Sequence, residues 1–172
     1  MSPSFDADLA AARAKYMRRN REALEQASLL LPDALDACPK DFSLEYPTRE
    51  LIRSASGWTL PWVDFYDPHW VSDTKRFGCV IHHESNVCGI ALGRLMAGSV
   101  YIEMIEGNPD VRHPFKGYVL DTVELVALIY AQLNAVSELR LIDPVQGAMT
   151  HYLNRGYQMA SGSPRYCWKK VW

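Results

Sequence analysis

The spacing of apolar residues changes along the second half of the chain, and each change predicts a new element. Residues 100–105 alternate β-branched and larger side chains, which is typical of a strand, and a Gly-Asn-Pro sequence follows where that strand must end. Residues 117–136 have apolar side chains at helical spacing on most of their surface, so we expect a long buried helix there. Residues 139–142 predict another short strand, and residues 146–155 predict a helix that ends at Gly156.

The strand pattern predicts a meander followed by a parallel pair. Three consecutive strands with short polar turns are expected at residues 77–84, 87–95 and 100–105. The long helix then leads the chain back, so that residues 139–142 can lie parallel to the third strand. A closing hairpin is expected at residues 157–160 and 166–172. The expected fold is therefore α/β (or α+β), with a mixed sheet of about six strands flanked by helices.

The N-terminal third predicts helices and loop. Residues 6–27 are Ala-rich and contain no Gly or Pro, so we expect a helix there, and residues 28–38 predict a shorter helix interrupted by a proline. Residues 39–47 are expected to be loop. Residues 48–55 predict one or two helical turns with Thr48 as the N-cap.

Length and charge narrow the class of protein. A chain of 172 residues can bury about two-thirds of its surface as a single domain. The net charge of −2 means that no global field favours nucleic acid or an anionic membrane. No apolar run approaches the ~18 residues needed to cross a bilayer, and the first residues lack the apolar core of a signal peptide. We expect a cytoplasmic monomer or homodimer with no membrane partner.

The residue types that most often bind metals do not form a metal-binding pattern. The four cysteines lack Cys-x-x-Cys spacing, so we expect reduced, buried thiols. His82 and His83 are adjacent, and adjacent strand residues point to opposite faces of a sheet, so they cannot share one ion without distortion. No metal is expected.

Two segments are open to both a structural and a functional interpretation. Residues 57–70 contain two prolines, Pro61 and Pro68, which are expected to prevent a helix there. They also contain five large aromatic rings, which form either a cover over the sheet or the wall of a substrate pocket. Residues 15–21 form a basic cluster on the first helix. This cluster is either a solvated helix face or an electrostatic handle for a protein or RNA partner.

The most informative segment is residues 99–157, which have the order strand, loop, long apolar helix, strand, helix. Its last helix carries the sequence Ala148-x-x-x-Tyr152-x-x-x-Gly156-Tyr157. Together these features resemble the GNAT family, the acyl-CoA-dependent N-acyltransferases, whose last helix carries Ala-x-x-x-Tyr-x-x-x-Gly-Phe/Tyr.

The resemblance implies a GNAT-like central mixed sheet flanked by helices and covers residues 45–172. We expect one domain, residues 1–172, in which residues 1–44 are an N-terminal helical elaboration in place of the family's first strand.

The resemblance also implies a site for the pyrophosphate of CoA at the start of the long helix, where family members carry Arg/Gln-x-x-Gly-x-Gly/Ala. Unpaired N–H groups and the helix dipole both favour an anion there. The matching cofactor-binding residues here are Arg112, Lys116, Gly117, Tyr118 and Val119. The family's second glycine falls on Val119 or Asp121, and a carboxylate at Asp121 would repel phosphate unless it points away. Side-chain charge from Arg112 and Lys116, together with that of His113, could replace the missing glycine.

Acyl transfer also needs an acid for the departing thiolate and a base for the amine. The resemblance assigns the acid to Tyr152, with Ala148 leaving room for the pantetheine arm and Ile105 beside the cofactor. The alternative for Tyr152 is a packing residue with its hydroxyl at the rim. Glu103 and Glu106 lie on the strand that lines the family's acceptor site and are the candidate bases. Three positions apart, they are expected on opposite faces of the pleat.

These residues support two functions. The first is an N-acetyltransferase that moves acetyl from acetyl-CoA, as co-substrate, to an amine on a small molecule, a protein or an aminoacyl-tRNA. Its acceptor site would be shaped by Trp62, Tyr66, Trp70 and Ser163. The second is a non-catalytic protein of the same fold that binds or regulates a partner and has lost acetyl-CoA binding. The identity of the acceptor does not follow from the sequence.

Overall fold

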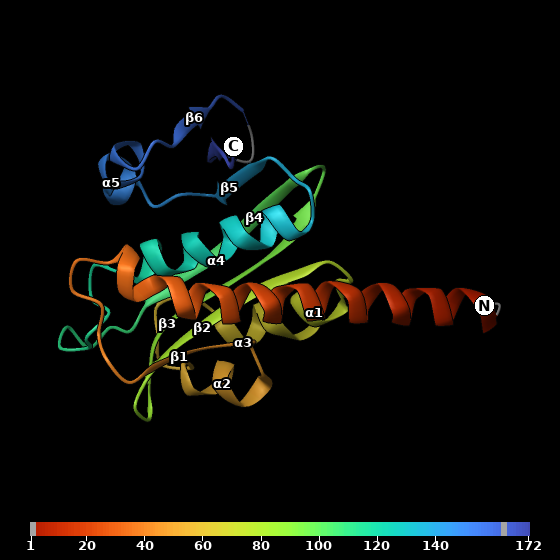
Figure 1. Ribbon diagram of the computed structural model, residues 1–172, viewed down its shortest axis with the longest axis horizontal. Helices are drawn as coiled ribbons and strands as arrows, with labels where there is room; N and C mark the ends of the chain where they lie inside the picture. Colours follow the sequence, from red (N-terminus) through yellow and green to blue (C-terminus); the bar gives the residue numbers. More distant parts are fainter. Residues whose placement is uncertain (1–2, 163–164) are drawn as a thin grey trace.

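A seven-stranded mixed sheet organises the chain in the computed structural model, which describes residues 3–162 and 165–172 (Figure 1). The strand order in this part of the chain is β1-β2-β3-β4-β5-β7-β6. β4 and β5 are parallel, and every other neighbouring pair is antiparallel. The predicted meander, parallel pair and closing hairpin are therefore confirmed. The strands are β1 Phe42–Glu45, β2 Arg76–His83, β3 Asn86–Met96, β4 Ser99–Gly107, β5 Glu138–Ile142, β6 Gln158–Ala160 and β7 Tyr166–Lys170.

Helices cover both faces of this sheet. α1 and α4 lie side by side on one face, as Figure 1 shows, and α2, α3 and η1 cover the other. η2 and α5 follow β5 and lead to the closing hairpin. The helices are α1 Pro3–Ala34, α2 Arg49–Ser54, α3 Trp62–Asp64, the π-helix η1 Phe65–Trp70, α4 Val119–Leu133, the 3₁₀ helix η2 Gln146–Ala148 and α5 Met149–Asn154. None of these helices has the length and apolar composition needed to span a membrane.

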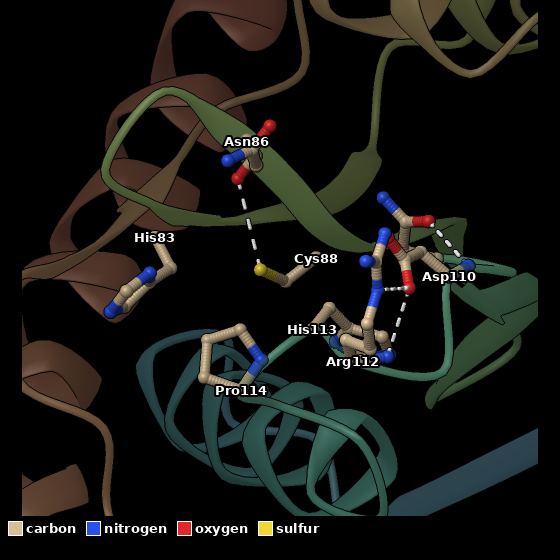
Figure 2. A pocket seen from close by; sticks show the side chains of 8 residues that line it. His83, Asn86, Cys88, Asp110, Arg112, His113 and Pro114 are labelled. Atoms are coloured by element: carbon tan, nitrogen blue, oxygen red, sulfur yellow. Dashed lines mark hydrogen bonds and ion pairs between the residues drawn. The ribbon is translucent and has the colours of Figure 1, made fainter.

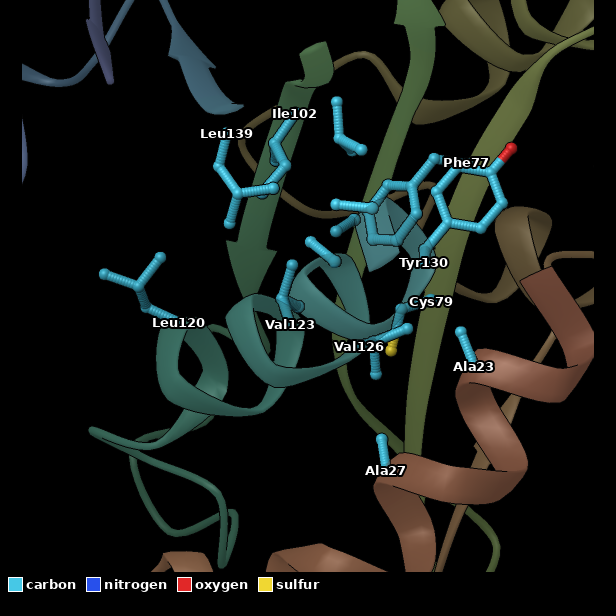
Figure 3. Close-up of a cluster of buried hydrophobic side chains, with 14 of the residues drawn as sticks. Ala23, Ala27, Phe77, Cys79, Ile102, Leu120, Val123, Val126, Tyr130 and Leu139 are labelled. Carbon is cyan, nitrogen blue, oxygen red and sulfur yellow. The ribbon is translucent and has the colours of Figure 1, made fainter. Parts of the chain in front are cut away.

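The larger core lies between α4 and the sheet. Val123, Val126 and Tyr130 are fully buried and point from α4 toward the strands (Figure 3). α1 packs beside α4 through Ala23 and Ala27, whose small side chains let the two helices approach closely. This packing explains why the apolar surface of α4 is so wide.

The opposite face carries a second core built on aromatic rings. Trp62, Tyr66 and Trp70 pack there with Ile90 and Leu92 of β3. The rings of Tyr66 and Trp70 stack with centroids 5.2 Å apart. The indole N–H of Trp70 donates to the carbonyls of Phe77 and Gly93, at 2.8 and 3.0 Å. Of the two interpretations of residues 57–70, the structure has the aromatic cover.

The N-terminal region differs from the prediction in two ways. α1 is one continuous helix through Pro32, because a proline near a helix end removes only one interior hydrogen bond. Residues 42–45, expected to be loop, form β1, which pairs antiparallel with β2. Four residues are too short for the alternation of buried and exposed positions to be recognised, and their pairing with β2 makes the strand. A first strand, which the N-terminal helices were expected to replace, is thus present as β1 after α1.

Two further local predictions can be compared with the structure. The Thr48 side chain caps α2 by accepting from the N–H of Leu51 at 3.3 Å, as predicted. Prolines were expected to prevent helix in residues 57–70, yet residues 62–70 are helical as α3 and η1. Asp67, before Pro68, has non-helical backbone angles, which is how the chain accommodates the ring.

We predict that Val123→Asp lowers the free energy of unfolding by about 3 kcal/mol or more, because it buries an unpaired carboxylate between α4 and the sheet. Urea unfolding followed by circular dichroism measures this. Leu29→Asp, at a residue that is 80% exposed on α1, is the control and should change stability by less than about 0.5 kcal/mol. Equal losses in the two variants would contradict this placement of α4.

Candidate functional site

The candidate site begins where β4 and β5 stop pairing. Their parallel ladder runs only from Ser99 with Glu138 to Ile102 with Leu141. Directly afterwards, Leu92 of β3 pairs with Met104 while Gly93 pairs with Ile102, which leaves Glu103 as the extra residue of a β-bulge. A bulge bends its strand, so β4 turns away from β5 at this point. A cavity of about 150 Å³ lies in the resulting cleft.

Tyr152 lines both this cleft and a second cavity. The cleft is lined by Ile105, Tyr152, Glu103 and other residues of β4 and β5, and by Leu60 and residues 143–145, which follow β5. The second cavity, of about 180 Å³, is also lined by Ile105 and Tyr152, and beyond them by Glu106, Val119, Leu120, Ala148 and His151. The structure therefore brings together predicted site residues from β4, from α4 and from the segment of η2 and α5.

The environment of Tyr152 favours a protonated phenol. The ring is buried and lies edge-on to Tyr157, with centroids 6.3 Å apart. Burial, and to a smaller degree the nearby Cys167, raises the pKa of Tyr152 above its usual value. Loss of water disfavours the phenolate, so the hydroxyl keeps its proton at neutral pH.

Two ion pairs fix the end of the helix that carries Tyr152. Arg155, at the C-terminus of α5, binds both carboxylate oxygens of Asp121 at 2.7 and 2.8 Å. One helical turn along α4, Glu124 binds Lys169 of β7, and Lys169 also donates to the carbonyl of Arg155 at 3.2 Å. α5 is therefore attached to α4 and β7 through charged groups.

Both candidate bases already have strong partners. Arg94 donates to the two oxygens of Glu103 at 3.0 and 2.7 Å and also binds Asp73 at 3.2 Å. The carboxylate of Glu106 accepts from the indole of Trp62 at 2.9 Å. It also accepts from the backbone N–H groups of Thr59 and Leu60, at 2.9 and 3.0 Å.

Glu103 and Glu106 lie on the same face of the sheet, the face covered by α2, α3 and η1. The prediction of opposite faces is wrong, because Glu103 is itself the extra residue of the bulge, which shifts the alternation along β4. Glu103 lines the cleft, whereas Glu106 lines the second cavity and anchors the loop before α3.

The start of α4 has an incomplete cap. Gly117 has φ +86°, a conformation that suits glycine, and turns the chain into the helix. Tyr118 is the N-cap and makes no side-chain capping bond, so the first N–H groups of α4 are open to another acceptor. Val119 lines the second cavity; Lys116, Gly117 and Tyr118 line neither the cleft nor that cavity.

Glycines on the strands make room for Val119. A Cβ at Gly89 of β3 would lie 2.9 Å from a methyl group of Val119, and one at Gly107 of β4 would lie 3.2 Å from the other. The helix thus approaches the sheet closely although the family's second glycine is missing. The sequence signal for this arrangement is a pair of glycines on two strands opposite a valine.

Arg112 does not reach this site. Its guanidinium binds Asp110 at 3.0 and 2.9 Å, and its side chain is 86% exposed. Figure 2 shows it beside a separate cavity of about 350 Å³, with Cys88 and His113 also on the wall. None of the residues lining that cavity lines the cleft or the second cavity. The ion pair with Asp110 accounts for this placement.

The predicted acceptor-site aromatics are part of the core. Trp62 is 1% exposed, Trp70 is 2% exposed, and Tyr66 is buried. None of the three lines the cleft or the second cavity; they pack in the core on the other face of the sheet. Ser163 lies outside the described residues. Sequence reasoning missed Leu60 and Asp143, which do line the cleft.

Comparison with known proteins identifies the fold. No protein-family model matches the sequence, and no curated protein matches it either. Solved structures do match this chain. The PaiA N-acetyltransferase of Thermoplasma acidophilum, in complex with coenzyme A, has a TM-score of 0.56 and 14% identity, over 75% of this chain and 98% of that one. The ribosomal-protein-S18-alanine N-acetyltransferase of Escherichia coli has a TM-score of 0.59 and 10% identity, over 76% and 94%.

An acetyltransferase of the GNAT family from Staphylococcus aureus has a TM-score of 0.56 and 13% identity, over 76% of this chain and 99% of that one. The chain has the GNAT fold. In this GNAT fold, the described residues contain no group of three or more His, Cys, Asp or Glu side chains arranged to hold a metal ion.

We predict that Glu106→Ala lowers the free energy of unfolding by about 1–3 kcal/mol, because Trp62 and the two backbone N–H groups before it lose their acceptor. Denaturant unfolding monitored by tryptophan fluorescence measures the loss. Glu45→Ala, on the half-exposed carboxylate of edge strand β1, is the control and should cost less than about 0.5 kcal/mol. An unchanged midpoint for Glu106→Ala would show that the carboxylate does not anchor this loop.

Proposed function

We propose that this protein is an acyl-CoA-dependent N-acyltransferase that moves acetyl from acetyl-CoA to an amine. The observation that carries this proposal is the position of Tyr152, at the junction of the cleft between β4 and β5 and the cavity beside the start of α4. A proton donor is needed there, because a thioester held in the cleft releases its thiolate there.

Acetyl-CoA would be held by residues of β4, α4 and α5. The pyrophosphate would bind at Lys116–Val119, where the first N–H groups of α4 are open. The pantetheine arm would pass the small side chain of Ala148, and the thioester would lie in the cleft beside Ile105. The two cavities share Ile105 and Tyr152 on their walls, which supports this arrangement.

The chemistry is one acyl transfer. The neutral amine attacks the thioester carbonyl, so that a C–N bond forms and the C–S bond breaks. Tyr152 gives its hydroxyl proton to the departing thiolate and later regains one from water. The amine loses its proton to a carboxylate through water; Glu103, which lines the cleft, is the first candidate and Glu106 the second. Arg94 holds Glu103 in position for this role.

The acceptor is an amine on a small molecule, a protein or an aminoacyl-tRNA. A protein or RNA partner would use the basic cluster of α1, part of which already serves the fold. Arg19 donates to Asn134, and the guanidinium of Arg21 lies over the ring of Tyr46. Lys15 and Arg18, at the helix surface, are the basic residues that such a partner would contact.

Titration with acetyl-CoA by isothermal calorimetry tests the proposal directly. We predict that the protein binds acetyl-CoA and that Lys116→Glu weakens binding by about 1.5–3 kcal/mol, roughly 10- to 150-fold in Kd, because a charge-assisted phosphate contact is reversed. Arg53→Glu, at an exposed residue of α2 on the other face of the sheet, makes the same charge change and should leave Kd unchanged. No binding to the unmutated protein would instead favour a non-catalytic protein of the same fold.

We predict that Tyr152→Phe lowers kcat about 10²-fold while acetyl-CoA affinity and thermal stability barely change, because the ring keeps its packing and only the proton is lost. A thiol-release assay with saturating acetyl-CoA measures this. Tyr157→Phe is the control, since this buried tyrosine touches the Tyr152 ring but lines neither cavity. Unchanged turnover with a lower melting temperature would make Tyr152 a packing residue.

A further inference from the structure

Asp121 places a negative charge beside the proposed phosphate site. It is in the first turn of α4, next to Leu120, which lines the cavity beside Tyr152. The open N–H groups of that turn favour an anion. The carboxylate of Asp121 is on the same turn, however, and it repels a phosphate group bound nearby. A diphosphate at the start of α4 is therefore bound more favourably when the charge of Asp121 is cancelled.

Arg155 has the geometry to cancel that charge. Two of its nitrogens bind the two oxygens of Asp121, at 2.7 and 2.8 Å, which is the bidentate arrangement that fixes both partners. Its third nitrogen binds Nδ1 of His151 at 2.8 Å. His151 lines the second cavity, so the Asp121–Arg155 pair lies directly behind its wall.

The neighbouring ion pair on α4 provides a comparison. Glu124 is one turn further along α4 and binds Lys169, with both side chains more buried than those of Asp121 and Arg155. Neither Glu124 nor Lys169 lines the cleft or the second cavity. The first pair attaches α4 to the end of α5 and the second attaches α4 to β7, but only the residues of the Asp121–Arg155 pair have direct neighbours that line the cavity.

We propose that Arg155 is a positioning residue for acyl-CoA, which keeps the start of α4 able to bind a diphosphate by neutralising Asp121. The inference rests on the proposed binding of acyl-CoA at this site. Its physical content is a charge balance: with Arg155 present the first turn of α4 attracts an anion, and without it Asp121 opposes one. If Arg155 only attached α5 to α4, removing the charge of Asp121 would not restore the affinity for CoA in a variant that lacks Arg155.

The experiment is a double-mutant cycle on CoA affinity, measured by isothermal calorimetry with CoA itself as the probe. We expect Arg155→Met to raise Kd at least about tenfold, because the carboxylate of Asp121 is then an unpaired negative charge in the first turn of α4. We expect Asp121→Asn to leave Kd unchanged or lower it. Combining Arg155→Met with Asp121→Asn should return Kd to within about threefold of the unmutated value.

Glu124→Gln is the matched control, because it breaks the other link between α4 and its neighbours and should lower stability without changing Kd. Arg155→Lys is the second variant if Arg155→Met does not fold. It keeps a positive charge but loses the bidentate contact, and we expect it to retain most of the affinity, whereas Arg155→Gln should lose it.

Each outcome has one meaning. Unchanged affinity in Arg155→Met or Arg155→Gln overturns the inference and leaves the proposed function intact. Weaker binding that Asp121→Asn does not restore also overturns it, because Arg155 would then act on the ligand or on the packing of α5. No CoA binding by the unmutated protein overturns both the inference and the proposed function.

Discussion

The parallel pairing of β4 with β5 holds only as far as Ile102 and Leu141, and the candidate site depends on where it stops. Backbone groups in a sheet stay paired wherever they are buried, so two neighbouring strands separate only if their groups find other partners. The bulge at Glu103 lets β4 keep its bonds to β3 while it bends away from β5. β5 meanwhile stays paired with β7 as far as Ile142. The cleft is thus built into the sheet.

Carboxylates around this cleft hold neighbouring elements of the fold together. Glu106 accepts three hydrogen bonds from the segment that leads into α3, and Glu103 is held by Arg94. Asp121 and Glu124 attach α4 to α5 and β7. Partly buried charges are stable only when they are paired, so each carboxylate fixes the element that supplies its partner. Those elements are the walls of the cleft and of the cavity next to it.

Close packing at the start of α4 depends on which side of the contact carries small residues. A helix approaches a sheet closely when one side of the contact is small. The resemblance led us to expect a second glycine on the helix, whereas here Gly89 and Gly107 place the small residues on the strands and Val119 fills the space. Motif spacing along one segment does not detect such an exchange, because its members are on different strands.

The sequence by itself determined the order and type of most elements, because the apolar periods of 2 and 3.6 residues are local properties. It also indicated the N-cap of α2 and the helix that carries Tyr152. Only the tertiary structure decided that residues 42–45 are a strand, since their role depends on pairing with β2. It also decided that Glu103 and Glu106 share a face and that Arg155 pairs with Asp121. A bulge and a long-range ion pair are set by contacts between distant segments, which leave no periodic trace in the chain.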